Sequence, residues 1–347
     1  MKKVKWGVIG AGGIADRRTI PGMLLADNAE LVSVMEIDTA FAQKLCAKYG
    51  AKRAYTRAQA LVEDPEIDAV YIASPVFAHA QQAMAAAEAG KHILIEKPLA
   101  LSSGEGKQIL ERCAQQGILI AAGFMMRFGA GVRAMRKAVL DGKIGRVVSG
   151  YAQFTCWYPD LPNCWRQNKS QSGGGALVDM GVHCIDLMQY VTGSPVKEVS
   201  AFNETLTFHY DVEDTSLVIL RLENGAVCTI QSNFNIPDDA AKWRLEFFGT
   251  QGRLLGDQVI GQSDGGTVNA LFLEAVGGYD AQQAGEKPAG ESLSITPVNT
   301  YQMEIESFSN SVLTGAPLEA PASDAVQVQQ VIEAAYRSSR EKRTILL

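Results

Sequence analysis

An aspartate and a histidine four residues apart have the types and spacing needed to move a proton on an alcohol. On a helix, the side chains of Asp179 and His183 would share one face. A carboxylate beside an imidazole favours the protonated ring and orients it, so the pair suits general base catalysis on a hydroxyl. The same spacing also fits a structural contact worth roughly 0.2–0.5 kcal/mol. The preceding run, Gly173-Gly174-Gly175, would let the backbone approach a ligand closely.

A lysine provides a second candidate for this chemistry. Lys97 follows an apolar run at residues 92–95, where a strand would end. Open α/β sheets bind ligands at the carboxyl ends of their strands. Pro98 would fix the turn and hold the lysine outward, so the ammonium group could hydrogen-bond to a substrate oxygen. The alternative is a surface lysine that caps a strand.

A glycine-rich turn near the N-terminus predicts a phosphate-binding site. The segment Gly10-Ala11-Gly12-Gly13-Ile14-Ala15 fits the pattern G-x-G-x-x-A, follows an apolar run and opens a predicted helix. Such glycines permit the tight turn and the close approach of a pyrophosphate, and the helix N-terminus supplies N–H donors. The residues expected to contact the cofactor here are Gly10, Gly12, Gly13 and Ile14.

An acidic residue supports a dinucleotide as the ligand of this turn. Glu36 ends the second predicted strand, where a carboxylate would accept the ribose hydroxyls, and Asp38 is a second candidate. A carboxylate at this place repels a 2′-phosphate, which favours NAD and leaves NADP as the alternative cofactor. The competing interpretation is that Glu36 is only a solvated charge at a strand end.

The elements that must position these residues alternate between strand and helix. Apolar strands with intervening helices, such as the Ala-rich residues 77–89, predict a doubly wound parallel sheet, which is a Rossmann domain over residues 1–122. Its strands are expected at residues 4–10, 31–35, 69–73, 92–95 and 119–122.

After residue 122 the pattern changes to longer strands. An Asn-Gly pair at Asn224 indicates a hairpin between two of them. Residues 123–347 are therefore predicted to form an α+β domain with a large, open, mainly antiparallel sheet for substrate binding and oligomerisation. Its strands are expected at residues 146–155, 196–208, 215–222, 226–234, 242–248 and 268–274, and its helices at 131–140, 301–313 and 324–340.

Two blocks of the sequence resemble the signature of the Gfo/Idh/MocA family, which includes glucose–fructose oxidoreductase and inositol dehydrogenases. The first block contains Ser74-Pro75, His79, Ala89-Gly90-Lys91-His92 and Glu96-Lys97-Pro98. The second contains Trp165-Arg166, Gly173-Gly174-Gly175, Asp179, Gly181, His183 and Asp186. The resemblance extends over the whole chain.

The resemblance implies a nicotinamide-dependent oxidoreductase acting on a CH–OH group of a sugar, sugar derivative or inositol. His183 would remove the hydroxyl proton, Asp179 would orient it and Lys97 would polarise the oxygen. The resemblance places Ser74, Pro75, His79, Glu96 and Lys97 at the cofactor. It places Lys97, Arg127, Trp165, Arg166, Asp179 and His183 at the substrate.

Several of these residues have a structural alternative. His79 is equally consistent with packing, and Arg127 with a salt bridge between the domains. Trp165 and Arg166 also fit a loop anchor or an oligomer contact, and Asp186 fits a support for the catalytic helix. Two other functions remain open: a redox-neutral lyase or glycosidase-like enzyme that oxidises its substrate transiently with bound NAD, and a non-enzymatic dinucleotide-sensing regulator.

Composition and charge narrow the class of protein. The chain has 347 residues, 47% of them hydrophobic, and a net charge of −6 without a basic stripe, which argues against a nucleic-acid surface. No apolar run is long enough to span a bilayer. The six cysteines form no C-x-x-C pair and no cluster with histidines, so we expect reduced thiols, no metal and a cytoplasmic protein. The family resemblance implies a homodimer or homotetramer.

Overall fold

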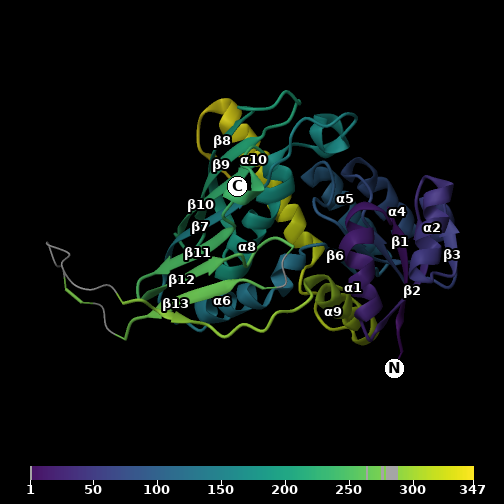
Figure 1. Cartoon of the computed structure of the whole chain (residues 1–347), viewed down its shortest axis with the longest axis horizontal. Coiled ribbons are helices and arrows are strands. Elements are labelled where there is room, and N and C mark those ends of the chain that lie inside the picture. The colour runs from purple at the N-terminus through teal and green to yellow at the C-terminus, as the bar shows by residue number, and fades with distance from the viewer. Residues whose placement is uncertain (1, 263–264, 275–276, 279–287) are drawn as a thin grey trace.

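The computed structural model describes residues 2–262, 265–274, 277–278 and 288–347, which build two sheets with their helices (Figure 1). The first sheet has six parallel strands in the order β3-β2-β1-β4-β5-β6. The strand order reverses between β1 and β4, which confirms the predicted doubly wound Rossmann sheet. The strands are β1 (Val4–Ile9), β2 (Ala29–Met35), β3 (Arg53–Tyr55), β4 (Ala69–Ile72), β5 (His92–Ile95) and β6 (Ile120–Ala122).

Burial on both faces explains why these strands have near-continuous apolar sequences. All four residues of β4 are buried, as expected for a parallel strand covered by helices. The three residues of β3 are only partly buried, and this short edge strand was not predicted. The helices of this part are α1 (Ile20–Leu25), α2 (Thr39–Tyr49), α3 (Ala58–Val62), α4 (His79–Glu88) and α5 (Ser103–Gln115).

The second sheet has nine strands in the order β14-β13-β12-β11-β7-β10-β9-β8-β15. Its strand pairs are antiparallel except β7 with β10, which confirms the predicted mainly antiparallel sheet. Exposed and buried residues alternate along β9, so one face of this strand packs on the core. The strands are β7 (Val147–Thr155), β8 (Val196–Glu204), β9 (Thr215–Leu222), β10 (Val227–Asn233), β11 (Arg244–Gly249), β12 (Gly252–Asp257), β13 (Thr267–Phe272), β14 (Glu291–Ser292) and β15 (Ile345–Leu346).

Four strands of this sheet differ from the sequence-based expectation, and two of them, β14 and β15, are two-residue strands that were not predicted. The strand predicted for residues 196–208 ends at Glu204. The backbone N–H groups of Leu206 and Thr207 donate to the Asp214 carboxylate at 2.9 and 2.8 Å and not to a neighbouring strand, so the strand does not continue. Strand β12 was missed, and the two glycines in its six residues weaken the strand pattern.

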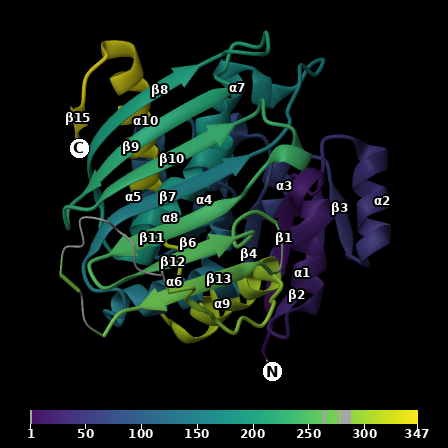
Figure 2. The same ribbon diagram turned by 60° about the vertical axis from the view of Figure 1, so that its left-hand side comes forward.

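Three helices cover one face of the second sheet: α6 (Ala130–Leu140), α8 (Val182–Thr192) and α10 (Ala322–Glu341). Figure 2 shows the strands in front of these helices, and the opposite face of the described sheet carries no helix. Exposed apolar side chains lie on the uncovered face, among them Leu217 and Ile219. Among the described residues, no helix is long and apolar enough to cross a membrane.

The C-terminal helices join the two sheets. Helix α9 (Thr300–Thr314), which the sequence assigned to the second domain, packs on α1, β1 and β2 of the first sheet (Figure 1). Phe308 of α9 lies with its ring centroid 5.4 Å from that of Trp6. Ala320, which lies closer to the end of the chain, also contacts the first sheet: its carbonyl accepts a hydrogen bond from the N–H of Ala122 in β6 at 3.0 Å. The last part of the chain therefore contacts both sheets. The domain boundary between residues 122 and 123 stays a prediction.

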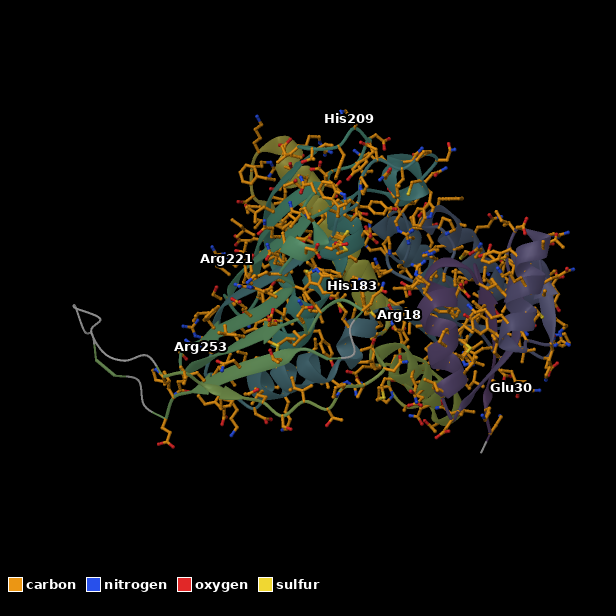
Figure 3. All side chains as sticks on the ribbon, viewed as in Figure 1. Arg18, Glu30, His183, His209, Arg221 and Arg253 are labelled. Carbon is orange, nitrogen blue, oxygen red and sulfur yellow. The ribbon has the colours of Figure 1, made fainter. Side chains whose placement is uncertain are left out.

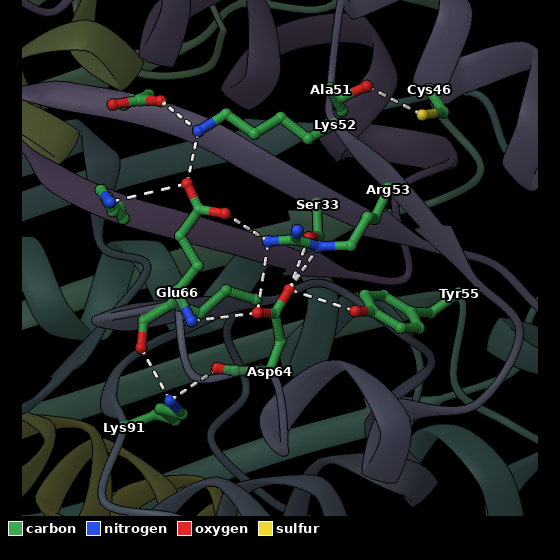
Figure 4. Close-up of polar contacts among 12 residues, drawn as sticks. Ser33, Cys46, Ala51, Lys52, Arg53, Tyr55, Asp64, Glu66 and Lys91 are labelled. Carbon is green, nitrogen blue, oxygen red and sulfur yellow. Dashed lines mark hydrogen bonds and ion pairs between the residues drawn. The ribbon is translucent and has the colours of Figure 1, made fainter.

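A cluster of charged residues stabilises the outer edge of the first sheet (Figure 4). Arg53 Nε donates to Asp64 Oδ2 at 2.8 Å, and Arg53 Nη2 donates to Glu66 Oε2 at 2.6 Å. Lys52 makes a further ion pair with Glu66. The buried Lys91 reaches the same loop, because its Nζ donates to the Asp64 carbonyl at 2.9 Å. The cluster holds the loop before β4 against β3.

This cluster predicts an acid-sensitive contribution to stability. Lys52 and Arg53 hold the pKa of Glu66 at about 2, below its ordinary value. A carboxylate with a lowered pKa stabilises the folded state above its unfolded pKa, and this contribution is lost as the pH falls from about 5 to 2. We expect the double variant Lys52→Met/Arg53→Met to have a lower urea midpoint at pH 7 and a smaller drop in midpoint between pH 6 and pH 3. An equal drop in both proteins would contradict this.

Candidate active site

A cavity of about 630 Å³ lies between the two sheets and collects most of the predicted catalytic residues. Its walls come from the turn after β1, the carboxyl ends of β4 and β5, and the start of the helix that leads into α8. Figure 3 labels His183 at this junction. The predicted site residues that line the cavity are Ile14, Ser74, His79, Glu96, Lys97, Trp165, Arg166, Asp179 and His183.

The turn after β1 has the geometry of a phosphate cradle. Gly10 has φ +73°, and a Cβ there would lie 2.5 Å from the Ser74 backbone nitrogen, so only glycine fits. Gly13 has φ +55°, and a Cβ there would meet nothing within 4 Å. The backbone at Gly13 is therefore open to a ligand at the beginning of a helical segment. These features fit the pyrophosphate of a dinucleotide.

Glu36 and Asp38 have different roles at the end of β2. Glu36 Oε1 accepts a hydrogen bond from the Gly12 N–H at 2.7 Å, so its carboxylate lies directly beside the glycine turn. Asp38 instead caps α2, because its Oδ1 accepts from the Phe41 N–H at 2.7 Å. Of the two acidic candidates, Glu36 has the position that fits a ribose contact.

An ion pair across the two sheets forms the chemical centre of the cavity. Lys97 Nζ, at the end of β5, donates to Asp179 Oδ1 at 2.8 Å and to the Asp179 carbonyl at 2.7 Å. Burial opposes the charge of the Asp179 carboxylate. The charges of Lys97 and Arg166 outweigh burial and hold the pKa of Asp179 below its ordinary value. The pair is therefore a charged one that keeps the ammonium group in the cavity.

His183 lies in the same cavity but pairs with neither of these groups. Its side chain is buried, its ring meets Phe154 edge-on at 6.2 Å, and no hydrogen bond to it occurs among the described residues. Burial, reinforced by the charge of Lys97, lowers the pKa of His183 well below its ordinary value, while Asp179 opposes the shift. The imidazole is therefore neutral at pH 7 and able to accept a proton.

The relation between Asp179 and His183 differs from the sequence-based expectation. The Asp179 carboxylate favours the protonated ring, as expected, but its hydrogen-bonding partner is Lys97 and not His183. The two residues also lie in different helical elements. Asp179 belongs to the π-helix Leu177–Gly181, and His183 belongs to α8, which begins at Val182.

A buried glutamate that the sequence did not reveal positions this helical segment. Glu213 Oε1 accepts from the Gly175 N–H at 3.0 Å, from the Leu177 N–H at 2.9 Å and from the Tyr336 hydroxyl at 2.8 Å. A Cβ on Gly175 would lie 2.0 Å from the Glu213 carbonyl oxygen, which explains a glycine at this position. Glu213 comes 38 residues after Gly175, and no local pattern signals the contact.

Arg127 makes structural ion pairs, but its partners all lie within residues 123–347, so these are not the salt bridge between the domains that the sequence suggested as its alternative. It is buried, and its Nε donates to Asp186 Oδ2 at 3.0 Å. Its Nη1 donates to Asp324 Oδ2 at 2.8 Å and to the Glu319 carbonyl at 2.9 Å. These partners occupy the guanidinium and connect the segment after β6 with α8 and α10. Asp186 supports the helix that carries His183, as the second interpretation of that residue required.

The turns around the lysine are tied together by His79. Its Nδ1 lies 3.0 Å from the Pro98 carbonyl and its Nε2 lies 2.8 Å from the Ser74 carbonyl. Glu96, next to Lys97, accepts from the Tyr71 hydroxyl at 2.5 Å. Pro75 continues the turn after Ser74. These contacts fix the floor of the cavity between the glycine turn and the ammonium group of Lys97.

Trp165 and Arg166 form the wall opposite this floor. The Arg166 guanidinium lies 4.4 Å from the centroid of the Trp165 ring, and its Nε lies 4.0 Å from Asp179 Oδ1. Both side chains are partly exposed, so they border the opening of the cavity. Their position fits contact with a substrate and does not need the alternative of a remote loop anchor.

Comparison with known proteins identifies the class of protein. Residues 4–124 match the model described as oxidoreductase family, NAD-binding Rossmann fold. Residues 132–255 match the GFO/IDH/MocA C-terminal domain. The protein is therefore an oxidoreductase with an NAD-binding Rossmann domain. The chain belongs to the Gfo/Idh/MocA family.

Relatives match this chain over nearly their full length. The 1,5-anhydro-D-fructose reductase of Ensifer adhaerens is 29% identical over 324 residues, which cover 93% of this chain and 92% of that protein. The myo-inositol 2-dehydrogenase of Thermotoga maritima is 27% identical, with 98% of both chains covered. The crystal structure of aldose-aldose oxidoreductase from Caulobacter crescentus, complexed with glycerol, has a TM-score of 0.89 at 25% identity over 100% of both chains.

Proposed function

We propose that this chain transfers a hydride between a nicotinamide cofactor and a ring hydroxyl of a sugar, sugar derivative or inositol. One observation carries the proposal. The Lys97–Asp179 ion pair and the neutral base His183 share a cavity that begins at a dinucleotide turn. Relatives that act on 1,5-anhydro-D-fructose and on myo-inositol support this substrate class.

Lys97 and His183 divide the work on the reacting hydroxyl. Lys97 donates a hydrogen bond to the hydroxyl oxygen and stabilises the negative charge that develops there during oxidation. The neutral imidazole of His183 accepts the hydroxyl proton. Asp179 fixes the direction of the Lys97 ammonium group through their ion pair. NAD, when bound, supplies the hydride acceptor.

The remaining site residues bind and orient. The glycine turn and Ile14 hold the pyrophosphate, Glu36 accepts the ribose hydroxyls, and the floor of the cavity holds the nicotinamide end. The floor consists of Ser74, Pro75, His79 and Glu96. Trp165 stacks on the C–H face of a sugar ring, and Arg166 contacts the substrate beside it. Arg127 acts through the junction of the two sheets.

The uncovered sheet face supports a homodimer or homotetramer. Phe202 is 67% exposed and Ile219 is 41% exposed on neighbouring strands. Val227 and Phe248 extend the apolar surface across β10 and β11. Two identical subunits could bury this face against each other in a symmetric oligomer, which is the usual arrangement of homo-oligomers. All six cysteines are free thiols, which fits a protein of the reducing cytoplasm.

A panel of aldoses, anhydro sugars and inositols, followed at the NADH absorbance, tests the proposed function. We expect stoichiometric NADH formation with at least one member of the panel. Product formation without net NADH would instead indicate the redox-neutral lyase or glycosidase-like route. Tight NAD binding with no product from any member would indicate the regulator.

The position of Glu36 predicts preference for NAD over NADP. A carboxylate beside the turn accepts ribose hydroxyls and repels a 2′-phosphate. We expect NAD to bind at least about tenfold tighter than NADP, and Glu36→Gln to reduce this ratio by weakening NAD and relieving the repulsion of NADP. Calorimetric titration of both oxidised cofactors measures the ratio. Asp38→Gln is the matched control and should leave the ratio unchanged, because Asp38 caps α2. Equal binding of both cofactors to the unmodified chain would contradict the prediction.

A further inference from the structure

Two arginines face the cavity without an acidic partner. Arg17 and Arg18, which follow the glycine turn, both line it. Arg18 Nε lies 3.4 Å from Gln262 Oε1, a contact from the first sheet's helix to the second part of the chain. Neither arginine makes an ion pair within the described residues. The neighbouring Asp16 is occupied, because it accepts hydrogen bonds from Lys48 at 2.7 Å and from a tyrosine hydroxyl at 2.8 Å.

The charges of the cavity do not balance. Its carboxylates are Asp179 and Glu96, and both are occupied. Asp179 pairs with Lys97, and Arg166 lies 4.0 Å from the same oxygen. Glu96 accepts from a tyrosine hydroxyl, and burial raises its pKa and so disfavours its charge. Arg17 and Arg18, which are exposed, therefore have no ion-pair partner among the carboxylates that line the cavity.

The cofactor's pyrophosphate is the obvious anion for these arginines, but the direction of Arg18 argues against it. The pyrophosphate fits the open backbone at Gly13, before the helix. Arg18 instead extends to Gln262, which belongs to the loop after β12 in the part of the chain that covers the cavity. Figure 3 labels Arg18 at the junction of the two parts. Arg18 therefore borders the cavity between the cofactor turn and the second part of the chain.

We infer that the substrate carries an anionic group, a carboxylate or a phosphate, which Arg17 and Arg18 bind while its hydroxyl lies at Lys97. Guanidinium groups suit both anions because their planar forks match paired oxygens. The inference rests on the proposed function and narrows its substrate class to sugar acids, sugar phosphates or charged inositol derivatives. Gln262 accepts from Arg18 and so orients that guanidinium for the anion.

Equilibrium binding to the protein–NADH complex tests this without relying on turnover. The probes are D-glucose, D-glucuronate and D-glucose 6-phosphate, with myo-inositol and myo-inositol 1-phosphate as a second series, measured by calorimetry at low and high salt. We expect at least one anionic probe to bind about tenfold or more tightly than its neutral counterpart. High salt should reduce this difference, because exposed ion pairs are screened. The carboxylate and phosphate arms identify which anion the site selects.

The double variant Arg17→Gln/Arg18→Gln identifies the residues responsible. It should lose the preference for the anionic probe, retain the affinity for the neutral one, and bind NADH within twofold of the unmodified chain. Arg340→Gln, an exposed arginine on α10, is the matched control and should change nothing.

Three outcomes would overturn the inference. They are equal affinity for neutral and anionic probes, no binding of any probe, and a loss of NADH affinity in the double variant, which would assign the arginines to the pyrophosphate. Failure of the proposed function looks different. In that case the anionic probe binds through the arginines, but no polyol of either class exchanges hydride with the cofactor.

Discussion

Replacing Lys97 by methionine is expected to lower kcat by about 10²–10⁴-fold, the range found when a polarising or acid–base group is removed. The ammonium group lies in the cavity, with Nζ 2.8 Å from Asp179 Oδ1. Methionine keeps the length and the apolar stem of the side chain but removes the positive charge and all donors. Steady-state hydride transfer on the best substrate of the panel, followed by NADH absorbance, measures the loss.

Controls separate this chemical role from a structural one. Removing Lys97 leaves the partly buried Asp179 without its hydrogen-bonded cation, so Lys97→Met also lowers stability, and thermal unfolding should be measured beside the kinetics. The double variant Lys97→Met/Asp179→Asn removes both charges and should recover stability without recovering kcat. Lys107→Met, an exposed lysine on α5, should affect neither. Full turnover by Lys97→Met would show that the lysine only joins the two sheets.

The first sheet and its ligand turn could be predicted because their signals are local. Apolar runs, the glycine pattern and Glu36 lie within 36 residues, and each is set by the backbone next to it. Gly10 shows the limit of such signals. Its positive φ follows from the pattern, but its second requirement, the close contact with Ser74, depends on a neighbouring strand.

The catalytic cluster was recognised from its residue types, but its internal pairing was not predictable. Asp179 and His183 are four residues apart, which suggested a partnership. The actual partner of Asp179 is Lys97, 82 residues earlier. The sequence carries no local sign of that contact or of the π-helix that contains Asp179. Glu213 fixes the same helical segment, but it lies 38 residues after Gly175 in the sequence. Its role could not be predicted for the same reason.

His183 gives the second large effect, because the structure leaves it as the neutral base of the cavity. His183→Asn keeps a polar side chain but cannot accept the proton at neutral pH. We expect kcat for alcohol oxidation to fall by about 10²–10⁴-fold, with NAD binding unchanged. Effects of His183→Asn and Lys97→Met should be less than additive, since both groups act on one hydroxyl. Single-turnover and steady-state rates of the single and double variants provide the measurement.

The pH dependence of kcat/KM tests whether His183 is the base and has a defined sign. Burial and the Lys97 charge lower the pKa of His183, so the active neutral form persists below pH 6.5 and the rate falls only as the pH drops through the lowered pKa. This fall in rate on the acid side is the acid limb of the pH profile. Lys97→Met removes one cause of the lowered His183 pKa, so the acid limb of its residual activity should shift to a higher pH. Asp179→Asn removes the opposing charge and should move the limb to a lower pH. In His183→Asn the limb should vanish. A limb that stays at one pH in all four proteins would assign the proton to another group.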